Sequence, residues 1–339
     1  MKIDNDIKLD FSDVLLRPMT SSLNSRSEVD LTRTFKFLHS SKTLTCVPII
    51  AANMDTVGTF EMAKVLQEHK MLTALHKFYT PKEIWEEIAN NGLDPYYTIF
   101  STGIRPADFE RLEEFKTRAL HLDINIIMID VPNGYIPDFF KSCKKVREMF
   151  PEHIIMAGNV VTADVTERLI QDCGIDIVKV GIGPGAQCQT RSVTGVGYPQ
   201  LSAIIETANA AHGLKGWIIG DGGCKTSGDI AKAFAGGADF IMIGSMLGGH
   251  DENCSEIIEK DGEKFVKIYG MSSEEAMVKH YGGIAAHRAS EGRTSLIPYK
   301  GSVENTVLSI LGGVRSSASY IGAVTIKEMS KRANFVRIK

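Results

Sequence analysis

A cysteine and a threonine two residues apart stand in a glycine-rich stretch, VKVGIGPGAQCQTRSVTGVGYPQ (178–200). Glycine permits sharp turns and close approach of the backbone to a ligand, so this stretch is typical of a loop shaped around a bound molecule. Cys188 is therefore a candidate nucleophile, because N–H groups near a thiol lower its pKa and favour the thiolate. The alternative is a cysteine that acts as a small buried apolar residue, as we expect of the other five.

Two neighbours of Cys188 suggest further chemistry. Lys179 lies within the apolar run 176–183 and could form a Schiff base with a carbonyl substrate, although a structural ion pair is the interpretation that we favour. The turn Gly183-Pro184-Gly185 would expose several carbonyl oxygens. Such oxygens can replace the hydration shell of a monovalent cation, so the loop is also a candidate cation site.

Eight short apolar runs with amphipathic segments between them would position these residues. The runs are VPIIAANM (47–54), MLTALHK (71–77), YYTIFSTG (96–103), INIIMIDVP (124–132), HIIMAGNV (153–160), DIVKVGIG (176–183), WIIGDGG (217–223) and FIMIGSM (240–246). Runs that are apolar on both faces are typical of buried parallel strands, and Thr59, Thr80 and Thr162 precede helix-like segments as N-caps would. Eight alternations predict an α/β fold, a (β/α)8 TIM barrel, with a doubly wound open sheet as the alternative.

Polar residues and glycines follow the expected strands, at the end where barrel active sites lie. Asp221-Gly222-Gly223 and Gly244-Ser245 follow the last two strands, where backbone N–H groups often bind phosphate. Asp221 would repel a phosphate but could accept hydrogen bonds from ribose hydroxyls. The alternative is that these glycines only make tight turns. Other expected strands end near Asn53, Asp55, His76, Lys77, Asp130 and Asn159.

Two segments lie outside a minimal barrel. Residues 1–46 precede the first expected strand, and residues 247–301 separate the last strand from a long helix in SVENTVLSILGGVRSSASY. Within the second segment, EIIEKDGEKFVKIYG predicts a hairpin that turns at Asp261-Gly262. Long loops inserted after barrel strands commonly form lids, so we expect a flap there. We expect residues 1–339 to form a single catalytic domain.

Composition excludes several classes of protein. The chain has 339 residues, is 43% hydrophobic and carries a net charge of −3, so it can bury a large core. The chain has no basic run of the kind that binds nucleic acids, and it has no apolar stretch long enough to span a membrane. The start of the chain lacks the apolar region of a signal peptide. The six cysteines show no paired spacing, which indicates reduced thiols and a cytoplasmic location.

Longer motifs resemble a known family. GIGPGAQCQTR, TGVGYPQLSA, GDGGCKTSGDIAKAFAGGADFIMIGSMLGGH, YGMSSEEAM and RASEG, together with FSDVLLRP near the start and ILGGVRSSASYIGA near the end, are similar to the GMP reductase branch of the IMP dehydrogenase/GMP reductase family. The resemblance implies a homotetramer that converts GMP to IMP, using NADPH and a potassium ion. In that reaction a cysteine attacks C2 of the purine, ammonia leaves, and hydride adds to the resulting thioimidate.

The resemblance also implies a role for each matching residue. Cys188 would be the nucleophile, and Thr190 and Glu291 would form the proton-transfer pair. The residues implied for GMP are Asp221 at the ribose, Gly222, Gly223, Gly244 and Ser245 at the phosphate, and Gly270, Met271, Ser272, Arg288, Ala289, Ser290 and Gly292 around the base. Those implied for NADPH are Lys77, Asp130 and His287, with Ser25, Arg26, Ser316, Ser317, Ala318 and Ser319 from a neighbouring subunit. Potassium would be bound by Gly183, Gly185 and Cys188, with Arg191 nearby.

The chain departs from the family pattern at several of these places. Ala186 stands where the family usually has serine, which removes a hydroxyl donor to the phosphate, and Ser245 replaces a glycine and could compensate. Gln187, Gln189 and His287 are further departures. An IMP dehydrogenase is the first alternative. Against it, HKFYTPKEIWEEI leaves no room for a CBS pair after the second strand, and no Arg-Tyr pair lies between Met271 and Glu291. A purine-nucleotide-binding protein without catalysis is the second alternative.

Overall fold

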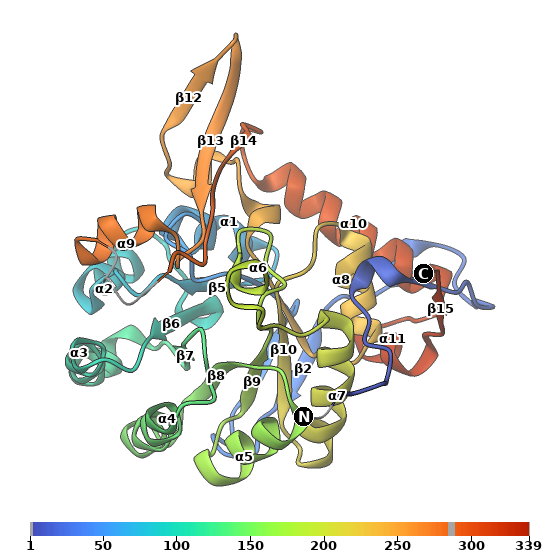
Figure 1. The fold of residues 1–339 in the computed structure, drawn as a ribbon, viewed down its shortest axis with the longest axis horizontal. Coiled ribbons are helices and arrows are strands. Elements are labelled where there is room, and N and C mark those ends of the chain that lie inside the picture. Colours follow the sequence, from blue (N-terminus) through green and yellow to red (C-terminus); the bar gives the residue numbers. More distant parts are fainter. Residues whose placement is uncertain (1–2, 284–288, 339) are drawn as a thin grey trace.

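Eight parallel strands close into a barrel in the computed structural model, which describes residues 3–283 and 289–338, with the backbone alone for residues 119–122 (Figure 1). Around the barrel the strands are β4 (Ile49–Ala51), β5 (Leu72–Leu75), β6 (Thr98–Thr102), β7 (Ile126–Asp130), β8 (Ile154–Val160), β9 (Ile177–Val180), β10 (Trp217–Asp221) and β11 (Phe240–Ile243). The predicted (β/α)8 barrel is confirmed, and the open sheet is excluded because β11 pairs with β4. Most strands are shorter than predicted, since their last residues turn into the loops of the site.

Helices cover the outside of the barrel (Figure 1). They are α1 (Phe60–Glu68), α2 (Pro81–Asn90), α3 (Pro106–Leu122), α4 (Pro137–Met149), α5 (Ala163–Cys173), α7 (Gln200–Gly213), α8 (Ser227–Ala235) and α10 (Glu304–Tyr320). The side chains of Thr59 and Thr80 accept hydrogen bonds from the first turns of α1 and α2, as predicted. Thr162 occupies the N-cap position of α5 but makes no such bond.

The N-terminal segment closes one end of the barrel. Strands β2 (Arg33–Lys36) and β3 (Thr43–Cys46) form a hairpin whose Phe35 is fully buried, with its ring stacked on Phe240 at a centroid distance of 4.2 Å. Phe35 and Phe37 belong to the apolar cluster inside the barrel, together with side chains of the barrel strands such as Ile50. The hairpin therefore seals the end where the strands begin and leaves the carboxyl ends of the strands for the site.

The segment between β11 and α10 forms a sheet of its own, which projects from the barrel (Figure 1). Its strands are β12 (Ile257–Lys260), β13 (Glu263–Tyr269) and β14 (Thr294–Pro298), and α9 (Glu274–Tyr281) lies between β13 and β14 in the chain. The predicted hairpin turn is confirmed: Asp261 and Gly262 connect β12 to β13, with φ angles of 54° and 79°. Two positive φ angles are the signature of a tight two-residue hairpin.

Short elements complete the chain. Strand β1 (Val14–Leu16) pairs with β15 (Phe335–Arg337). The remaining helices are α6 (Thr190–Thr194), α11 (Ile326–Arg332), η1 (Phe11–Asp13), η2 (Arg26–Glu28), η3 (Pro95–Tyr97), η4 (Ser245–Leu247) and η5 (Asp251–Asn253). None of the helices in the described ranges has the length and apolar character needed to cross a membrane.

Candidate active site

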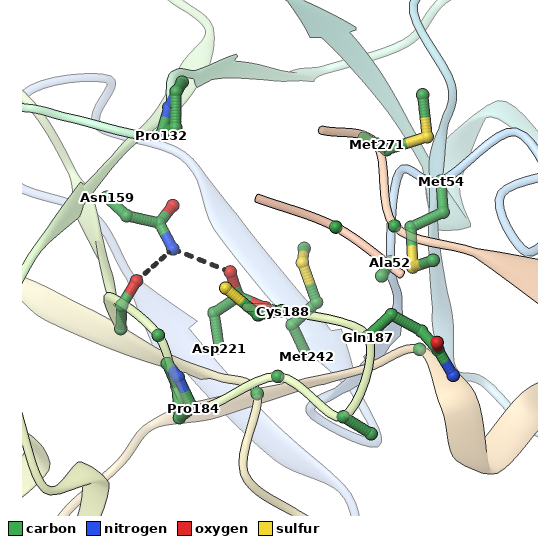
Figure 2. Close-up of a pocket in the computed structure, with 18 of the residues that line it drawn as sticks. Ala52, Met54, Pro132, Asn159, Pro184, Gln187, Cys188, Asp221, Met242 and Met271 are labelled. Carbon is green, nitrogen blue, oxygen red and sulfur yellow. Dashed lines mark hydrogen bonds between the residues drawn. The ribbon is translucent and has the colours of Figure 1, made fainter. Parts of the chain in front are cut away.

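A lysine surrounded by acceptors forms the floor of the site. The Nζ atom of Lys179 on β9 lies 2.6 Å from Asp221 Oδ2, 2.9 Å from Asp130 Oδ1 and 2.9 Å from Asn159 Oδ1. The lysine side chain is only 4% exposed. Asn53 donates to the second oxygen of Asp130 at 2.9 Å, and Asn159 donates to Asp221 at 2.8 Å (Figure 2). The ends of β7, β8, β9 and β10 are thereby joined by one polar network.

The network fixes the charge of Lys179. Burial alone would lower the pKa of Lys179, but the adjacent carboxylates of Asp130 and Asp221 outweigh it and raise this pKa above the ordinary value. Burial raises the pKa of Asp130, and the charge of Lys179 outweighs that effect and holds this pKa below its usual range. An ammonium ion whose three protons are all donated is a poor nucleophile. The ion-pair interpretation of Lys179 is therefore favoured over a Schiff base.

The candidate nucleophile lies on the loop that follows β9, on the same pocket as the Lys179 network. Cys188 is exposed, and its Sγ atom lies 3.2 Å from Thr190 Oγ1. The hydroxyl of Thr190 in turn donates to Glu291 Oε2 at 2.7 Å. The geometry gives a thiol that donates to a hydroxyl, which donates to a carboxylate. Such a chain can carry a proton between the sulfur and the carboxylate.

Backbone hydrogen bonds bring Glu291 to the cysteine, although about 100 residues separate the two in the chain. Gln189 donates its N–H to the carbonyl of Glu291 at 2.7 Å, and Arg293 donates to the carbonyl of Gln187 at 3.0 Å. The N–H of Glu291 reaches the carbonyl of Ser272 at 3.1 Å. Three loop segments, around residues 188, 272 and 291, are thus held side by side.

Glycines let the loops of the site come close together. Gly222 and Gly223 have φ angles of 85° and 87°, which favour glycine. A Cβ atom on Gly222 would lie 3.2 Å from the backbone nitrogen of Gly185. The loops after β9 and β10 are therefore packed backbone against backbone, and the N–H of Gly222 donates to the carbonyl of Met242 at 3.4 Å.

One pocket collects most of the predicted catalytic and substrate residues (Figure 2). Those that line it are Cys188, Thr190, Glu291, Asp221, Gly222, Gly223, Gly244, Ser245, Gly270, Met271, Ser272 and Gly292. Gly183 and Gly185, predicted for the cation, line it as well. Ala289 and Ser290 do not line it, and Arg288 and His287 lie outside the described residues.

A second pocket continues from the first. The two share Asn53, Asp130, Pro132, Asn159, Lys179, Asp221, Met271 and Ser272. The second pocket extends to Lys77, Phe78, Ile104, Arg105, Val131, Met277 and Tyr281. Lys77 and Asp130, both predicted for the dinucleotide, therefore lie on one hollow. Its walls combine apolar side chains with the ammonium of Lys77, which lies 3.4 Å from Asp108.

The other residues predicted for the dinucleotide lie elsewhere. Arg26 donates to Ser316 Oγ at 2.7 Å, which places η2 beside α10. Ser25, Arg26 and residues 316–319 line neither pocket. Ala318 is fully buried, so its side chain is not available at this surface. Within one chain, the structure does not bring this group to the site.

Other predicted positions have structural partners. The guanidinium of Arg191 pairs with Asp10 at 2.8 Å and donates to the carbonyl of Tyr198, so its side chain braces the glycine loop. Gln187 is buried, and its amide oxygen accepts from Ser295 at 3.1 Å, which links the loop to β14. Ala186 and Ser245 both line the first pocket. The hydroxyl of Ser245 therefore lies on the same pocket as the position where Ala186 lacks one, which compensation requires.

Sequence reasoning left Asn53 and Asn159 without a role. Both line the two pockets and hold the carboxylates of Asp130 and Asp221. The signal that marks them is their position: each lies at or just beyond the carboxyl end of a barrel strand, where side chains converge on the site. Met54, Pro132 and Met242 add apolar walls that the sequence did not single out.

Comparisons with known proteins agree with the geometry. Residues 8–339 match the family model described as IMP dehydrogenase / GMP reductase domain. The chain is 56% identical to GMP reductase 2 of Homo sapiens over 99% of this chain and 96% of that protein. It is 54% identical to GMP reductase of Shewanella pealeana over 100% of this chain and 97% of that protein.

Proposed function

Because the chain belongs to the IMP dehydrogenase/GMP reductase family, we propose that it converts GMP to IMP and ammonia at the expense of NADPH, a reaction of purine salvage. The observation that carries the proposal is the hydrogen-bonded chain from Cys188 through Thr190 to Glu291. These three residues line a pocket that the glycine loops also line. Mere binding of a nucleotide needs no thiol linked to a carboxylate.

The relay accounts for the first half of the reaction. The thiol of Cys188 passes its proton toward Glu291, and the sulfur forms a bond to C2 of the purine. The exocyclic amine receives a proton through Thr190 and leaves as ammonia, which breaks the C2–N bond. The product of this half is a thioimidate between the cysteine and the purine.

The second half restores the thiol. When bound, NADPH would supply a hydride to C2; the C2–S bond would break with its electron pair returning to sulfur, and a proton from solvent would convert the thiolate of Cys188 back to the thiol. Lys77, Asp130 and the apolar wall of the second pocket would hold the nicotinamide end beside C2, with His287 nearby. The shared lining of the two pockets supports this arrangement, because a hydride moves only between atoms in contact.

The floor and the glycine loops would hold GMP. The backbone of Gly222, Gly223, Gly244 and Ser245 would bind its phosphate, and the N–H of Gly222 would then be shared with the carbonyl of Met242, to which it donates at 3.4 Å. Asp221 keeps Oδ2 for Lys179 and Asn159, which leaves Oδ1 for ribose hydroxyls. Gly270, Met271, Ser272 and Gly292, with Arg288, Ala289 and Ser290, would enclose the base.

Carbonyl oxygens of Gly183, Gly185 and Cys188 would hold a potassium ion on the loop that carries the nucleophile. The Gly185 carbonyl accepts from Cys188 N at 3.0 Å and retains a second lone pair for an ion. Arg191 braces this loop from its other side through Asp10. The ion's contribution would be to stiffen the loop, not to react.

The assembly that we propose is a homotetramer of single-domain chains, each spanning residues 1–339, without a CBS pair. Ser25, Arg26 and residues 316–319 line neither pocket of their own chain, which supports a role at the dinucleotide of a neighbouring subunit. Residues 247–301 would form the flap over the site. Free thiols at all six cysteines support a cytoplasmic location.

The test is an assay of GMP with NADPH and potassium that follows NADPH absorbance and ammonia together. Equal loss of NADPH and gain of ammonia is expected. A parallel mixture of IMP and NAD tests the dehydrogenase. Reduction of NAD there would contradict the proposal, and binding of GMP without turnover in either mixture would favour a non-catalytic nucleotide-binding protein.

A further inference from the structure

A buried carboxylate lies under α9, outside both pockets. Asp55 follows β4, and its side chain is 2% exposed. Its Oδ2 accepts from Tyr269 Oη at 2.7 Å, Lys279 Nζ at 3.0 Å and His280 Nε2 at 2.6 Å. A carboxylate that holds two other donors acts as an acceptor, so the imidazole of His280 donates from Nε2. Lys279 and His280 belong to α9, and Tyr269 ends β13.

An aromatic contact strengthens the same junction. The ring of Phe78, which follows β5, lies on the ring of His280 with centroids 3.4 Å apart and planes inclined by 3°. The loops after β4 and β5 therefore both contact one turn of α9. Burial would raise the pKa of Asp55, but the hydrogen bonds from Tyr269, His280 and Lys279 outweigh it and hold this pKa below the ordinary value.

Apolar burial contributes little to the position of α9. Of its eight residues Ala276 is the one that is buried, whereas Val278 is 57% exposed and Tyr281 is 41% exposed. Glu275 attaches α9 to its own sheet, through Lys267 at 2.6 Å and Thr294 at 3.1 Å. On the barrel side, α9 contacts the barrel through the Asp55 junction and through Tyr281, whose ring lies 4.5 Å from the Arg105 guanidinium, 5.9 Å from Lys77 Nζ and edge-on to Phe78 at 6.2 Å.

The position of α9 matters because it forms a wall of the second pocket. Met277 and Tyr281 line that pocket, and Met271 and Ser272, just before α9, line both pockets. Asp55 itself lines neither. We propose that Asp55 is a positioning residue that docks α9 on the barrel and so shapes the wall against which the dinucleotide binds. This inference rests on the proposed function and adds a determinant of its cofactor affinity.

The direction of the effect follows from the geometry. A buried carboxylate is expensive to desolvate, and removing its charge leaves Lys279 without its partner. The helix then loses its main polar attachment to the barrel. The wall that α9 gives to the second pocket loosens, whereas the phosphate loops and Cys188, which β9, β10 and β11 carry, stay in place.

The experiment compares Asp55→Asn with Glu275→Gln, which removes a carboxylate that ties α9 to its own sheet and not to the barrel. We expect Asp55→Asn to raise KM for NADPH about tenfold, because the buried acceptor of three hydrogen bonds loses its charge, with KM for GMP changed less than about twofold. Glu275→Gln should leave the KM values for both substrates within about twofold. Hydrogen exchange of residues 274–281 should accelerate in Asp55→Asn and not in Glu275→Gln.

Two outcomes overturn the proposal: equal changes in the KM values for GMP and NADPH, or unchanged exchange in α9. If Asp55→Asn does not fold, Tyr269→Phe removes one of the three bonds and should give a smaller change of the same kind. If the unaltered protein has no reductase activity, the proposed function fails, and the exchange of α9 still decides whether Asp55 docks the helix.

Discussion

The Lys179 network and the Cys188 loop lie on the same pocket but are held in different ways. The network is a set of charges and amides at four neighbouring strand ends, with the lysine 4% exposed. The loop is mostly half-buried with Cys188 exposed, and backbone hydrogen bonds between three segments distant in sequence hold it in place. The difference separates the two tasks of the proposed function: the Lys179 network would orient the substrate, and the Cys188 loop would perform the chemistry.

Replacing the thiol should give the largest effect, and the effect should fall on catalysis and not on GMP binding. Cys188→Ala removes the nucleophile, so kcat should fall by more than about 10³-fold, while the glycine loops still bind GMP. Steady-state rates and calorimetry of GMP binding measure the two quantities. Cys254→Ala, at the other exposed cysteine, is the matched control and should retain activity. Loss of GMP binding in Cys188→Ala would show that the Cys188 loop and the Lys179 network do not have separate roles.

Removing the central cation of the floor should act on stability. Lys179→Met leaves the half-buried carboxylates of Asp130 and Asp221 without their cation, with only the amides of Asn53 and Asn159 as donors. The free energy of unfolding should therefore fall by about 3–5 kcal/mol. Urea denaturation at neutral pH measures it. Lys82→Met breaks an exposed pair with Glu86 and should change that free energy by less than about 0.5 kcal/mol. A stable Lys179→Met protein would mean that the floor does not depend on its charge network.

The pH dependence of stability should separate two histidines at the two ends of the barrel. Burial lowers the pKa of His76, near the mouth, to about 4. The unfolded chain takes up this proton below about pH 6.5, where the folded protein does not, so His76 should reduce stability by up to about 3 kcal/mol as the pH falls toward 4. The hydrogen bond that His212 donates to the carboxylate of Asp239 raises the pKa of His212. The stabilisation from this bond is therefore complete below about pH 6.5 and is lost as the pH rises through the folded pKa.

Urea denaturation across pH 4.5–8, of His76→Gln and His212→Gln beside the unaltered protein, tests this pair. The difference between His76→Gln and the unaltered protein should grow in the acid direction, with the variant less sensitive to acid. The difference for His212→Gln should shrink as the pH rises. Parallel curves for all three proteins would contradict both assignments.

Restoring a hydroxyl to the phosphate loop should give the smallest effect. Ala186→Ser adds one donor beside the predicted phosphate position, and a hydrogen bond to a charged group contributes about 1–3 kcal/mol. The affinity for GMP should rise, with less effect if Ser245 already supplies that donor. Calorimetry with GMP measures this affinity, and Ser245→Gly in the same background shows whether the hydroxyl of Ser245 compensates for the one that Ala186 lacks. Unchanged affinity in both variants would show that neither hydroxyl meets the phosphate.

The features that the sequence predicted correctly are those that depend on residues close together in the chain. The eight strands, the Asp261-Gly262 turn and the N-caps at Thr59 and Thr80 follow from local patterns of apolar residues and turn formers. The clustering of Cys188, Thr190 and Glu291 at one pocket followed from long motifs, not from spacing.

The rest depends on contacts between distant residues. Phe35 gives no local sign that it seals the barrel against Phe240. Asp55 appears in the sequence as one of several polar strand-end residues, and its partners Tyr269, Lys279 and His280 lie more than 200 residues away. Gln187 is a polar residue in a loop and gives no sign in the sequence that it is buried. Its burial depends on β14, whose Ser295 donates to its side chain.

The most direct test of the account is the fate of the transferred hydrogen. NADPH that carries deuterium at the reactive C4 position is incubated with GMP, and the nucleotide product is examined by mass spectrometry and NMR. The account predicts IMP with one deuterium at C2, formed in equal amount with ammonia and lost when Cys188 is replaced by alanine. Product without deuterium, or xanthosine monophosphate formed by water, would contradict hydride transfer to a cysteine-bound purine.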